Sequence, residues 1–157
     1  MPTKFKSFED LLQPDPRFKS KLVGKFINCL MVEGKKTLAQ RIFYRAIDEV
    51  ARKIKDQDPL EIFNKAVGNV KPQVEVRSRR VGGATYQVPQ QVPQKRQLSL
   101  AFRWMLASVR GKKGRPTHVK LADEILNAYK GEGDAIKKRD DIHKMAEANK
   151  AFAHLAY

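Results

Sequence analysis

The sequence predicts a mainly α-helical, single-domain bundle of about six helices with a protruding two-stranded β-hairpin arm. Apolar residues recur at helical spacing in segments that proline and glycine separate, whereas residues 73–89 alternate between apolar and polar side chains. A chain of 157 residues can bury roughly two-thirds of its unfolded surface, which is enough for one apolar core. Residues 1–157 are therefore expected to form one domain.

The amino-terminal part of the chain is expected to begin as an irregular tail and to continue into two helices. Prolines interrupt residues 1–19, and a first helix is predicted over about residues 20–32, before Gly34. A second helix is predicted to begin near Thr37, whose hydroxyl can cap the first turn. The predicted buried stripes of these helices are Leu22, Val23, Phe26, Ile27 and Leu30, and then Leu38, Ile42, Ala46, Ile47, Val50 and Ile54.

The third helix has the clearest predicted start. Asp58 offers a capping carboxylate, Pro59 suits the first helical position, and Glu61 follows the cap by three residues. Pro72 cannot continue a helix, so the helix is expected to end before it. Its predicted buried residues are Ile62, Phe63, Ala66, Val67 and Val70.

Residues 73–89 are predicted to form a β-hairpin. Valines alternate with charged residues, as is typical of a strand, and Gly82 and Gly83 provide the turn between two such strands. The ribbon is too polar to form the core of a sheet, and an isolated hairpin is at best marginally stable in water. We therefore interpret it as an arm, whose arginines favour contact with an anion-rich partner.

A fourth helix is predicted over about residues 94–110. Arg96, Arg103 and Arg110 recur at seven-residue intervals, which places three guanidinium groups along one line of this helix. Such a line can follow a row of phosphates. The predicted apolar side of the helix consists of Leu98, Ala101, Phe102, Met105, Leu106 and Val109.

Two further helices complete the predicted fold. Thr117 is expected to cap the fifth, which ends at Gly131, and Asp134 is expected to cap the sixth. Residues 137–139 are cations in the first turns of the sixth helix, where the helix dipole disfavours positive charge unless phosphates approach. The rest of this segment is expected to pack through Ile142, Met145, Ala146 and Phe152.

The charge balance favours a polyanionic partner. Lysine and arginine number 32 against 17 acidic residues, for a formal net charge of +15. Membrane binding is disfavoured because no run of 18 or more apolar residues occurs, and the amino terminus lacks the apolar segment of a secretory signal, so a cytoplasmic location is expected. The cationic residues predicted to contact nucleic acid are Lys35, Lys36, Arg77, Arg79, Arg80, Lys95, Arg96, Arg103, Arg110, Lys112, Lys113, Arg115, Lys137, Lys138 and Arg139.

Two aromatic residues are candidates for stacking on bases. Tyr86, interpreted as lying near the hairpin root, is kept as a stacking candidate, whereas Trp104 lies beside an apolar stripe and is expected to be packed. Catalytic and cofactor motifs do not emerge. The single cysteine, Cys29, is interpreted as core filler, and the three histidines lack the spacing of a metal site, so no cofactor and no metal are expected.

Three blocks of this sequence resemble bacterial-type small-subunit ribosomal protein seven. They are residues 26–46, with Met31-Val32-Glu33-Gly34-Lys35-Lys36 at their centre, the arm at residues 74–89, and residues 137–154. Through the last block, the resemblance adds His143 and Lys144 to the candidate RNA-binding residues. The sequence departs from the family at both ends: residues 2–10 lack its arginine cluster, and the carboxyl end, residues 153–157, stops early and lacks the terminal arginine of many relatives.

The resemblance implies a structural protein of the small ribosomal subunit. Such a protein would bind the 3′ major, or head, domain of the small-subunit ribosomal RNA and help to nucleate head assembly, and it would be a monomer outside the ribosome. Its arm would lie near the exit-site transfer RNA and the messenger RNA path, and small-subunit ribosomal protein eleven would be its neighbour. An organellar rather than bacterial origin stays open.

Two rival functions are retained on the residues alone. In a helical DNA-binding regulator, the predicted helices on either side of Gly34 or Gly114 could form a helix-turn-helix pair, although the arm would then have no obvious role. An RNA-modifying enzyme would need a nucleophile, an acid–base pair or a cofactor loop. The leading hypothesis is a non-catalytic protein that binds RNA by neutralising its phosphates and recognising its shape.

Overall fold

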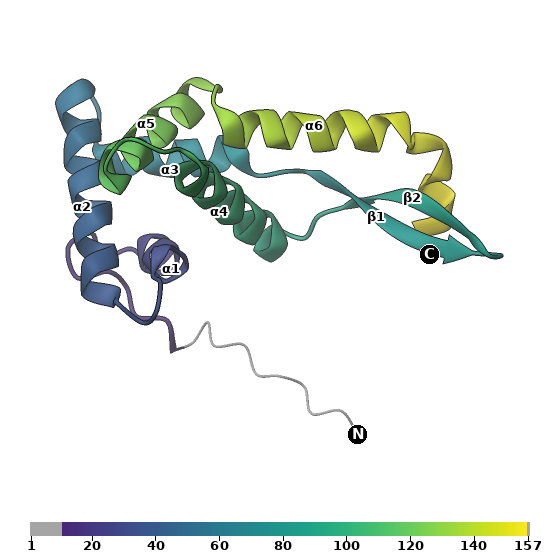
Figure 1. Cartoon of the computed structure of the whole chain (residues 1–157), viewed down its shortest axis with the longest axis horizontal. Coiled ribbons are helices and arrows are strands. Elements are labelled where there is room, and N and C mark those ends of the chain that lie inside the picture. Colours follow the sequence, from purple (N-terminus) through teal and green to yellow (C-terminus); the bar gives the residue numbers. More distant parts are fainter. Residues whose placement is uncertain (1–10, 157) are drawn as a thin grey trace.

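The computed structural model describes residues 11–156 and confirms the predicted fold class. Helices α1 to α5 form a body at one end of the molecule, and the hairpin and α6 extend together from that body (Figure 1). The elements are α1 (Lys21–Leu30), α2 (Lys36–Lys53), α3 (Pro59–Val70), β1 (Val74–Val81), β2 (Ala84–Gln91), α4 (Gln94–Gly111), α5 (Thr117–Lys130), α6 (Asp134–Ala148) and the 3₁₀ helix η2 (Lys150–Ala156). None of the helices in this range has the length and apolar character needed to cross a membrane.

Four phenylalanine rings from four helices form the centre of the body. Phe26 of α1 lies between Phe43, Phe63 and Phe102, with ring centroids 5.6, 5.2 and 5.0 Å away. All four rings are at most 1% exposed. Since tilted and edge-to-face rings attract beyond the area that they bury, this cluster fixes how α1, α2, α3 and α4 approach one another.

The predicted helix starts are only partly correct. Asp58 caps α3 as predicted, because its carboxylate accepts a hydrogen bond from the Leu60 N–H at 3.3 Å. Thr37, Thr117 and Asp134 were predicted as caps, and each instead lies inside its helix, which begins one or more residues earlier than the capping interpretation requires. The first turn of α6 is capped from another helix instead of by a local side chain.

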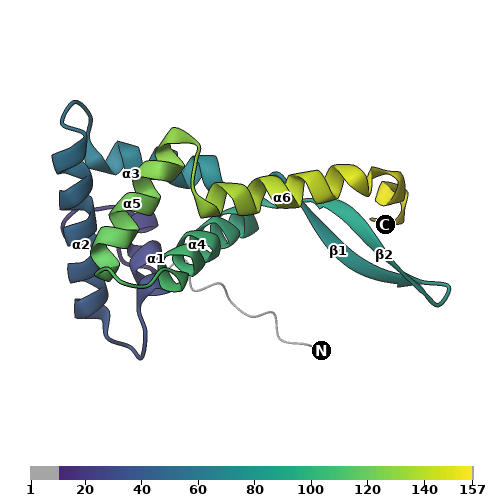
Figure 2. The ribbon, with the colours of Figure 1, turned by 45° about the horizontal axis from the view of Figure 1, so that its top comes forward.

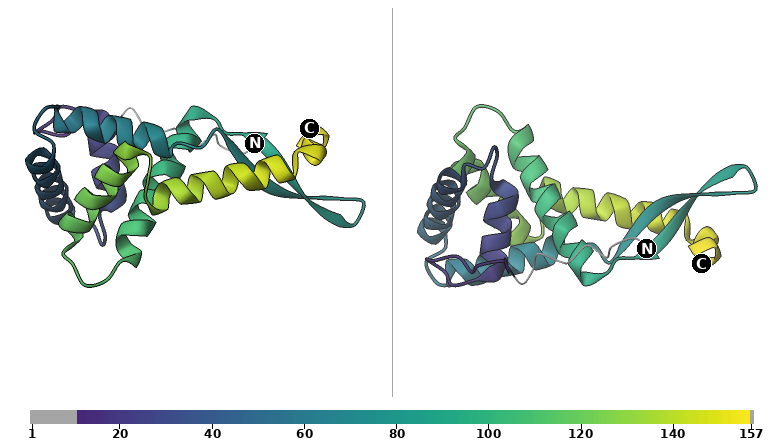
Figure 3. Two further views of the ribbon diagram at one scale, coloured as in Figure 1. Left: turned by 90° about the horizontal axis from the view of Figure 1, so that it is seen from above. Right: turned by 90° about the horizontal axis from the view of Figure 1, so that it is seen from below.

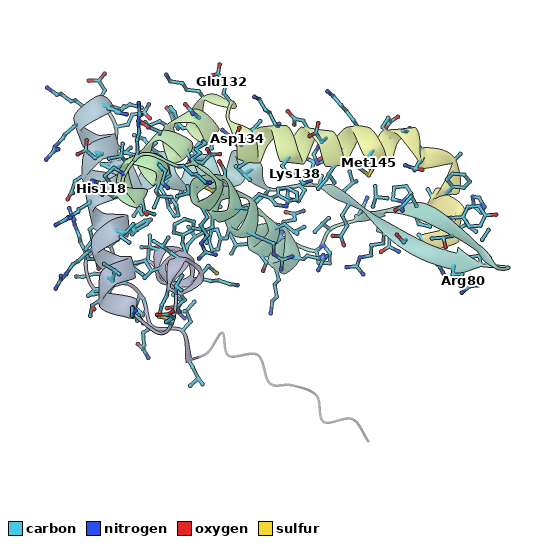
Figure 4. All side chains as sticks on the ribbon, in the orientation of Figure 1. Arg80, His118, Glu132, Asp134, Lys138 and Met145 are labelled. Carbon is cyan, nitrogen blue, oxygen red and sulfur yellow. The ribbon has the colours of Figure 1, made fainter. Side chains whose placement is uncertain are left out.

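The buried stripe of α2 differs from the predicted one. Leu38 is 51% exposed, whereas Ala39 and Phe43 are buried together with the predicted Ala46, Ile47 and Val50. The observed stripe starts one residue later, and Leu38 falls at its edge. On α6, Met145 was predicted to pack and is instead 50% exposed, because this half of α6 has left the body (Figure 4).

The hairpin forms as predicted and is supported along one side. Strands β1 and β2 pair antiparallel from Val74 opposite Gln91 to Val81 opposite Ala84, and both turn glycines have positive φ. Helix α6 contacts β1, and η2 folds back onto β2. Figures 2 and 3 show α6 and the hairpin leaving the same end of the body from every side. The arm therefore gains tertiary support that an isolated hairpin lacks.

The segment before α1 is irregular, as predicted, over residues 11–19. Its buried carboxylate, Asp15, accepts hydrogen bonds from the Arg17 and Phe18 N–H groups and from the Tyr44 hydroxyl. Burial, together with the bond to Asp15, raises the pKa of Tyr44 to about 12. The prediction of an irregular tail over residues 1–10 lies outside the described part of the chain.

Candidate nucleic-acid interface

The predicted cationic residues are mostly exposed. Exceptions are Lys112 and Arg139, which are half-buried, as is His143 of the resemblance-derived set. The exposed ones are Lys35, Lys36, Arg77, Arg79, Arg80, Lys95, Arg96, Arg103, Arg110, Lys113, Arg115, Lys137, Lys138 and Lys144. They lie at the start of α2, on β1, on α4, on the turn after it and on α6.

Three arginines follow the exposed strand of the arm. Arg77, Arg79 and Arg80 all belong to β1 and are exposed. Arg80 lies near the far end of the hairpin (Figure 4), and the Nη1 of Arg79 donates to the Leu155 carbonyl of η2. The arm thus places positive charge well beyond the helical body.

At the root of the arm, a buried carboxylate joins two of the predicted arginines. Glu75 of β1 is 8% exposed. Its Oε1 accepts from the Arg77 Nε at 2.7 Å and from the Arg96 Nε at 2.9 Å, and its Oε2 lies 2.8 Å from the same Arg96 Nε. No acidic residue occupies the first turn of α4, so the acidic partner of Arg96 comes from β1.

The arginine line of α4 continues along a groove against α1. A groove of about 390 Å³ is lined by Arg103 and Arg110 of α4 and by Lys25 and Cys29 of α1, with Phe102 among its apolar residues. The Arg110 Nη2 lies 3.4 Å from the Cys29 and Leu30 carbonyls at the end of α1. This cation complements the partial negative charge of that helix end.

Two carboxylates bind the half-buried Lys112. Its Nζ lies 2.7 Å from the Glu124 Oε2 and 3.0 Å from the Asp134 Oδ2, and the Glu124 side chain is fully buried. The other Glu124 oxygen accepts from the Ala135 N–H at 3.1 Å, which caps α6 from α5. Lys112 therefore ties α4, α5 and α6 together, and its location indicates a structural role.

Both partners of this junction have shifted pKa values. Burial alone would lower the pKa of Lys112, but its hydrogen bonds to Glu124 and Asp134 raise it overall. The bond from Lys112, with a further one from the Ser108 hydroxyl, lowers the pKa of Asp134. The lysine and the aspartate are thus charged at neutral pH. Figure 4 shows Asp134 at the start of α6 and Glu132 in the turn from α5.

A second hollow collects cations that the sequence did not single out. It has a volume of about 510 Å³ at the turn between α4 and α5. Lys53, Lys120 and Lys130 line it beside the predicted Lys113 and Arg115. These three lysines lie on two amphipathic helices, so only the packing of α2 against α5 reveals that they converge. Asp123 is the one acid among the lining residues that belong to the described chain.

The cations at the start of α6 have different environments. Lys137 and Lys138 are exposed, and Figure 4 shows Lys138 on α6. Arg139 turns inward, where its Nη1 donates to the Asn69 carbonyl at the end of α3. The Nε2 of His143 accepts the Gln73 N–H at 3.1 Å, so this histidine fastens α6 to the chain entering the arm.

The aromatic candidates have separate roles. The register places Tyr86 opposite Arg79, toward the tip of the arm, so its interpretation as a root residue was wrong. Its ring packs on Phe152 of η2, with centroids 5.3 Å apart. Trp104 is half-buried against the core, as predicted.

Cys29 is not core filler, because its side chain is exposed beside the α1–α4 groove. The last turn of α1 directs Leu30 rather than Cys29 into the core. Partial burial of the thiol raises its pKa, so the reactive thiolate is disfavoured at neutral pH. Across residues 11–156, no group of three histidine, cysteine or carboxylate side chains could hold a metal ion.

Comparison with known proteins identifies the family. The model of the family described as ribosomal protein S7p/S5e matches residues 2–150. The chain belongs to this family. The protein named small ribosomal subunit protein uS7 from Rhodopirellula baltica is 58% identical over 144 residues, which cover 91% of this chain and 92% of that protein. Proteins of the same name are 58% identical in Thermotoga maritima (91% and 92% covered) and 53% identical in Anaeromyxobacter sp. strain Fw109-5 (98% of both).

The family confirms the resemblance read from the three sequence blocks. Members of the S7p/S5e family are structural ribosomal proteins, so the chain is a ribosomal protein and not an enzyme. The bacterial sources of these relatives confirm the predicted cytoplasmic location. The RNA-modifying enzyme and the DNA-binding regulator are thereby set aside.

Proposed function

We propose that this S7p/S5e-family protein is a structural component of the small ribosomal subunit that binds ribosomal RNA through its exposed cations. The observation that carries the proposal is the arm, where Arg77, Arg79 and Arg80 lie exposed on a strand that extends away from the apolar core. Exposed arginines far from the core contribute little to folding, whereas they can neutralise phosphates. The bacterial relatives carry the name of a small-subunit protein.

The finer assignments belong to the same proposal. The RNA bound is the 3′ major domain of the small-subunit ribosomal RNA, and binding helps to nucleate head assembly. The arm lies near the exit-site transfer RNA and the messenger RNA path, small-subunit ribosomal protein eleven is a neighbour, and the protein is monomeric outside the ribosome. The remaining contacts come from the cations of α4, of the turn after it and of α6, since these are exposed as the arm is.

A salt series on RNA binding tests the proposal. The full chain is bound to a transcript of the 3′ major domain, and affinity should fall by about 0.7 to 0.9 log units per log unit of salt for each phosphate neutralised. Joint replacement of Arg77, Arg79 and Arg80 by alanine should weaken binding and reduce that slope by about two to three such steps. A slope that is flat for the wild-type protein would refute electrostatic RNA binding.

A matched control separates the arm from total charge. Arg41, Arg45 and Arg52 are three exposed arginines of α2, outside all the predicted clusters. Their joint replacement by alanine removes the same charge and should reduce the slope less than the arm replacement does. Equal slopes for the two triple variants would show that net charge, rather than the arm, determines binding. Equal-length duplex DNA serves as the competitor and should displace little RNA.

A further inference from the structure

Glu75 is an unexpected residue to find on an RNA-binding arm. It lies on the strand that carries the three arginines, its carboxylate repels phosphate, and it is buried although the strand is exposed from Arg77 onward. A buried carboxylate is costly unless cations compensate it. Both compensating cations, Arg77 and Arg96, are themselves predicted RNA contacts, and they come from different elements.

The geometry leaves the outer edges of both arginines available. Each guanidinium uses its Nε toward Glu75. Within the described part of the chain, neither Arg77 nor Arg96 donates through an Nη atom to another residue. The Glu75 side chain is 11% exposed, against 51% for Arg77 and 45% for Arg96, so the carboxylate lies beneath the guanidinium groups.

The arrangement has the charge and the donors for one phosphodiester. Both Nε atoms bind the same oxygen, Oε1, so both guanidinium groups lie against one carboxylate. Two arginines and one carboxylate leave a single net positive charge, which balances the single negative charge of one phosphodiester. Arginine presents its donors in a rigid fork, and fixing the Nε fixes the direction of the Nη groups.

We propose that Glu75, Arg77 and Arg96 form a phosphate-binding site at the root of the arm, in which Glu75 is a positioning residue for the two arginines. The site takes one phosphodiester of the RNA backbone, through the Nη groups. This inference rests on the proposed RNA binding. It predicts an effect opposite in sign to the one that net charge alone predicts. Removing a negative charge from the protein should here weaken RNA binding.

The test is Glu75→Gln in the salt series described above, with wild-type protein measured in parallel. Because charge-assisted hydrogen bonds are positioned by this carboxylate, the variant should bind the transcript about five- to tenfold more weakly at fixed salt. Its salt slope should fall by about 0.7 to 0.9, the equivalent of one phosphate. The matched control is Glu147→Gln, an exposed α6 carboxylate paired only with Lys150 in the described chain, which should bind as tightly as wild type or more tightly.

A second background tests whether Glu75 acts through the two arginines. In the double variant Arg77→Ala, Arg96→Ala, adding Glu75→Gln should cause no further weakening, because no guanidinium group remains to be positioned. Equal weakening in both backgrounds would show that Glu75 acts independently of Arg77 and Arg96, which overturns the inference. Arg96→Lys keeps the charge but loses the fork, so it should also weaken binding; wild-type affinity in this variant would count against the site.

The outcomes distinguish failure of the phosphate site from failure of the proposed RNA binding. If wild-type protein binds with a steep salt slope and Glu75→Gln binds equally well or better, the phosphate site is wrong while RNA binding stands. If wild-type protein shows no salt-dependent binding, both proposals fall together. Weaker binding by Glu75→Gln alone, with Glu147→Gln unaffected, supports the site.

Discussion

Replacing Phe26 by alanine should remove a large part of the stability of the body. The ring is fully buried and contacts three other rings from α2, α3 and α4. Truncation of a buried phenylalanine costs about 3 to 5 kcal/mol. For Phe26→Ala the lost free energy of unfolding should reach the upper half of that range. Each lost ring pair adds about 0.5 to 1.5 kcal/mol, and the three surrounding helices cannot all move in to fill the cavity left by the ring. The melting temperature should fall by roughly 10 °C.

Guanidinium unfolding can measure this cost directly. Trp104 is the single tryptophan of the chain and is half-buried against the core, so its fluorescence reports the loss of packing. Leu22→Ala provides the control, because Leu22 belongs to the same helix and is only half-buried; it should cost about 1 kcal/mol. The denaturant slope should be unchanged in both variants. A Phe26→Ala cost no larger than that of Leu22→Ala would refute the central role of the ring cluster.

Three further outcomes follow from the shifted groups and from the arm. Asp134→Asn should lower the melting temperature at pH 7, because the Lys112 bond lowers the folded-state pKa of Asp134. The stability that this bond contributes is present above the ordinary carboxyl pKa of about 3.9 and is lost as pH falls through the lowered value. The melting temperatures of the wild-type protein and the variant should therefore converge in acid. Cys29 should react with a disulfide reagent in the folded protein, more slowly at pH 7 than a free thiol and faster as pH rises; complete protection would contradict its exposure. Tyr86→Ala should increase amide hydrogen exchange in η2, because the ring contact with Phe152 is lost, and unchanged exchange would show that this contact does not hold η2.

The sequence predicted the elements whose signals are local. The start of α3 is encoded by a capping carboxylate and a proline in adjacent positions, and the structure confirms both. The hairpin turn is encoded by Gly82 and Gly83, since positive φ at both positions favours glycine. The seven-residue spacing of the α4 arginines also depends only on the helix that carries them.

Features that depend on tertiary contacts could not be predicted in this way. The α6 cap comes from Glu124 on α5, so inspection of the residues next to Asp134 pointed to the wrong capping group. Leu38 was assigned to the core of α2 by periodicity alone, but the position of α1 and α5 decides which side of the stripe is covered. Cys29 was misplaced for the same reason, at the edge of an apolar face.

The candidate site shows the same division between local and tertiary signals. Clusters of lysine and arginine in turns and on the arm were visible in the sequence, and most of these side chains are exposed. Their partners were not visible: neither the burial of Glu75 nor its bond to Arg96, which is 21 residues away, has a sequence signal. Lysines of separate helices, such as Lys53 and Lys120, converge only in the folded protein.

The buried carboxylates explain why the cations of this protein cannot be treated as equivalent. Glu124 is fully buried, and its neutralisation by Lys112 is part of the core, so loss of this lysine would leave a charge uncompensated inside the protein. Its neighbour Lys113 is exposed, and within the described residues it compensates no buried carboxylate. Glu75 differs from both cases, because it compensates arginines that still face outward. In the proposed phosphate site, Glu75 orients cations toward RNA, whereas Glu124 and Asp134 bind the amine of Lys112 at the junction of α4, α5 and α6.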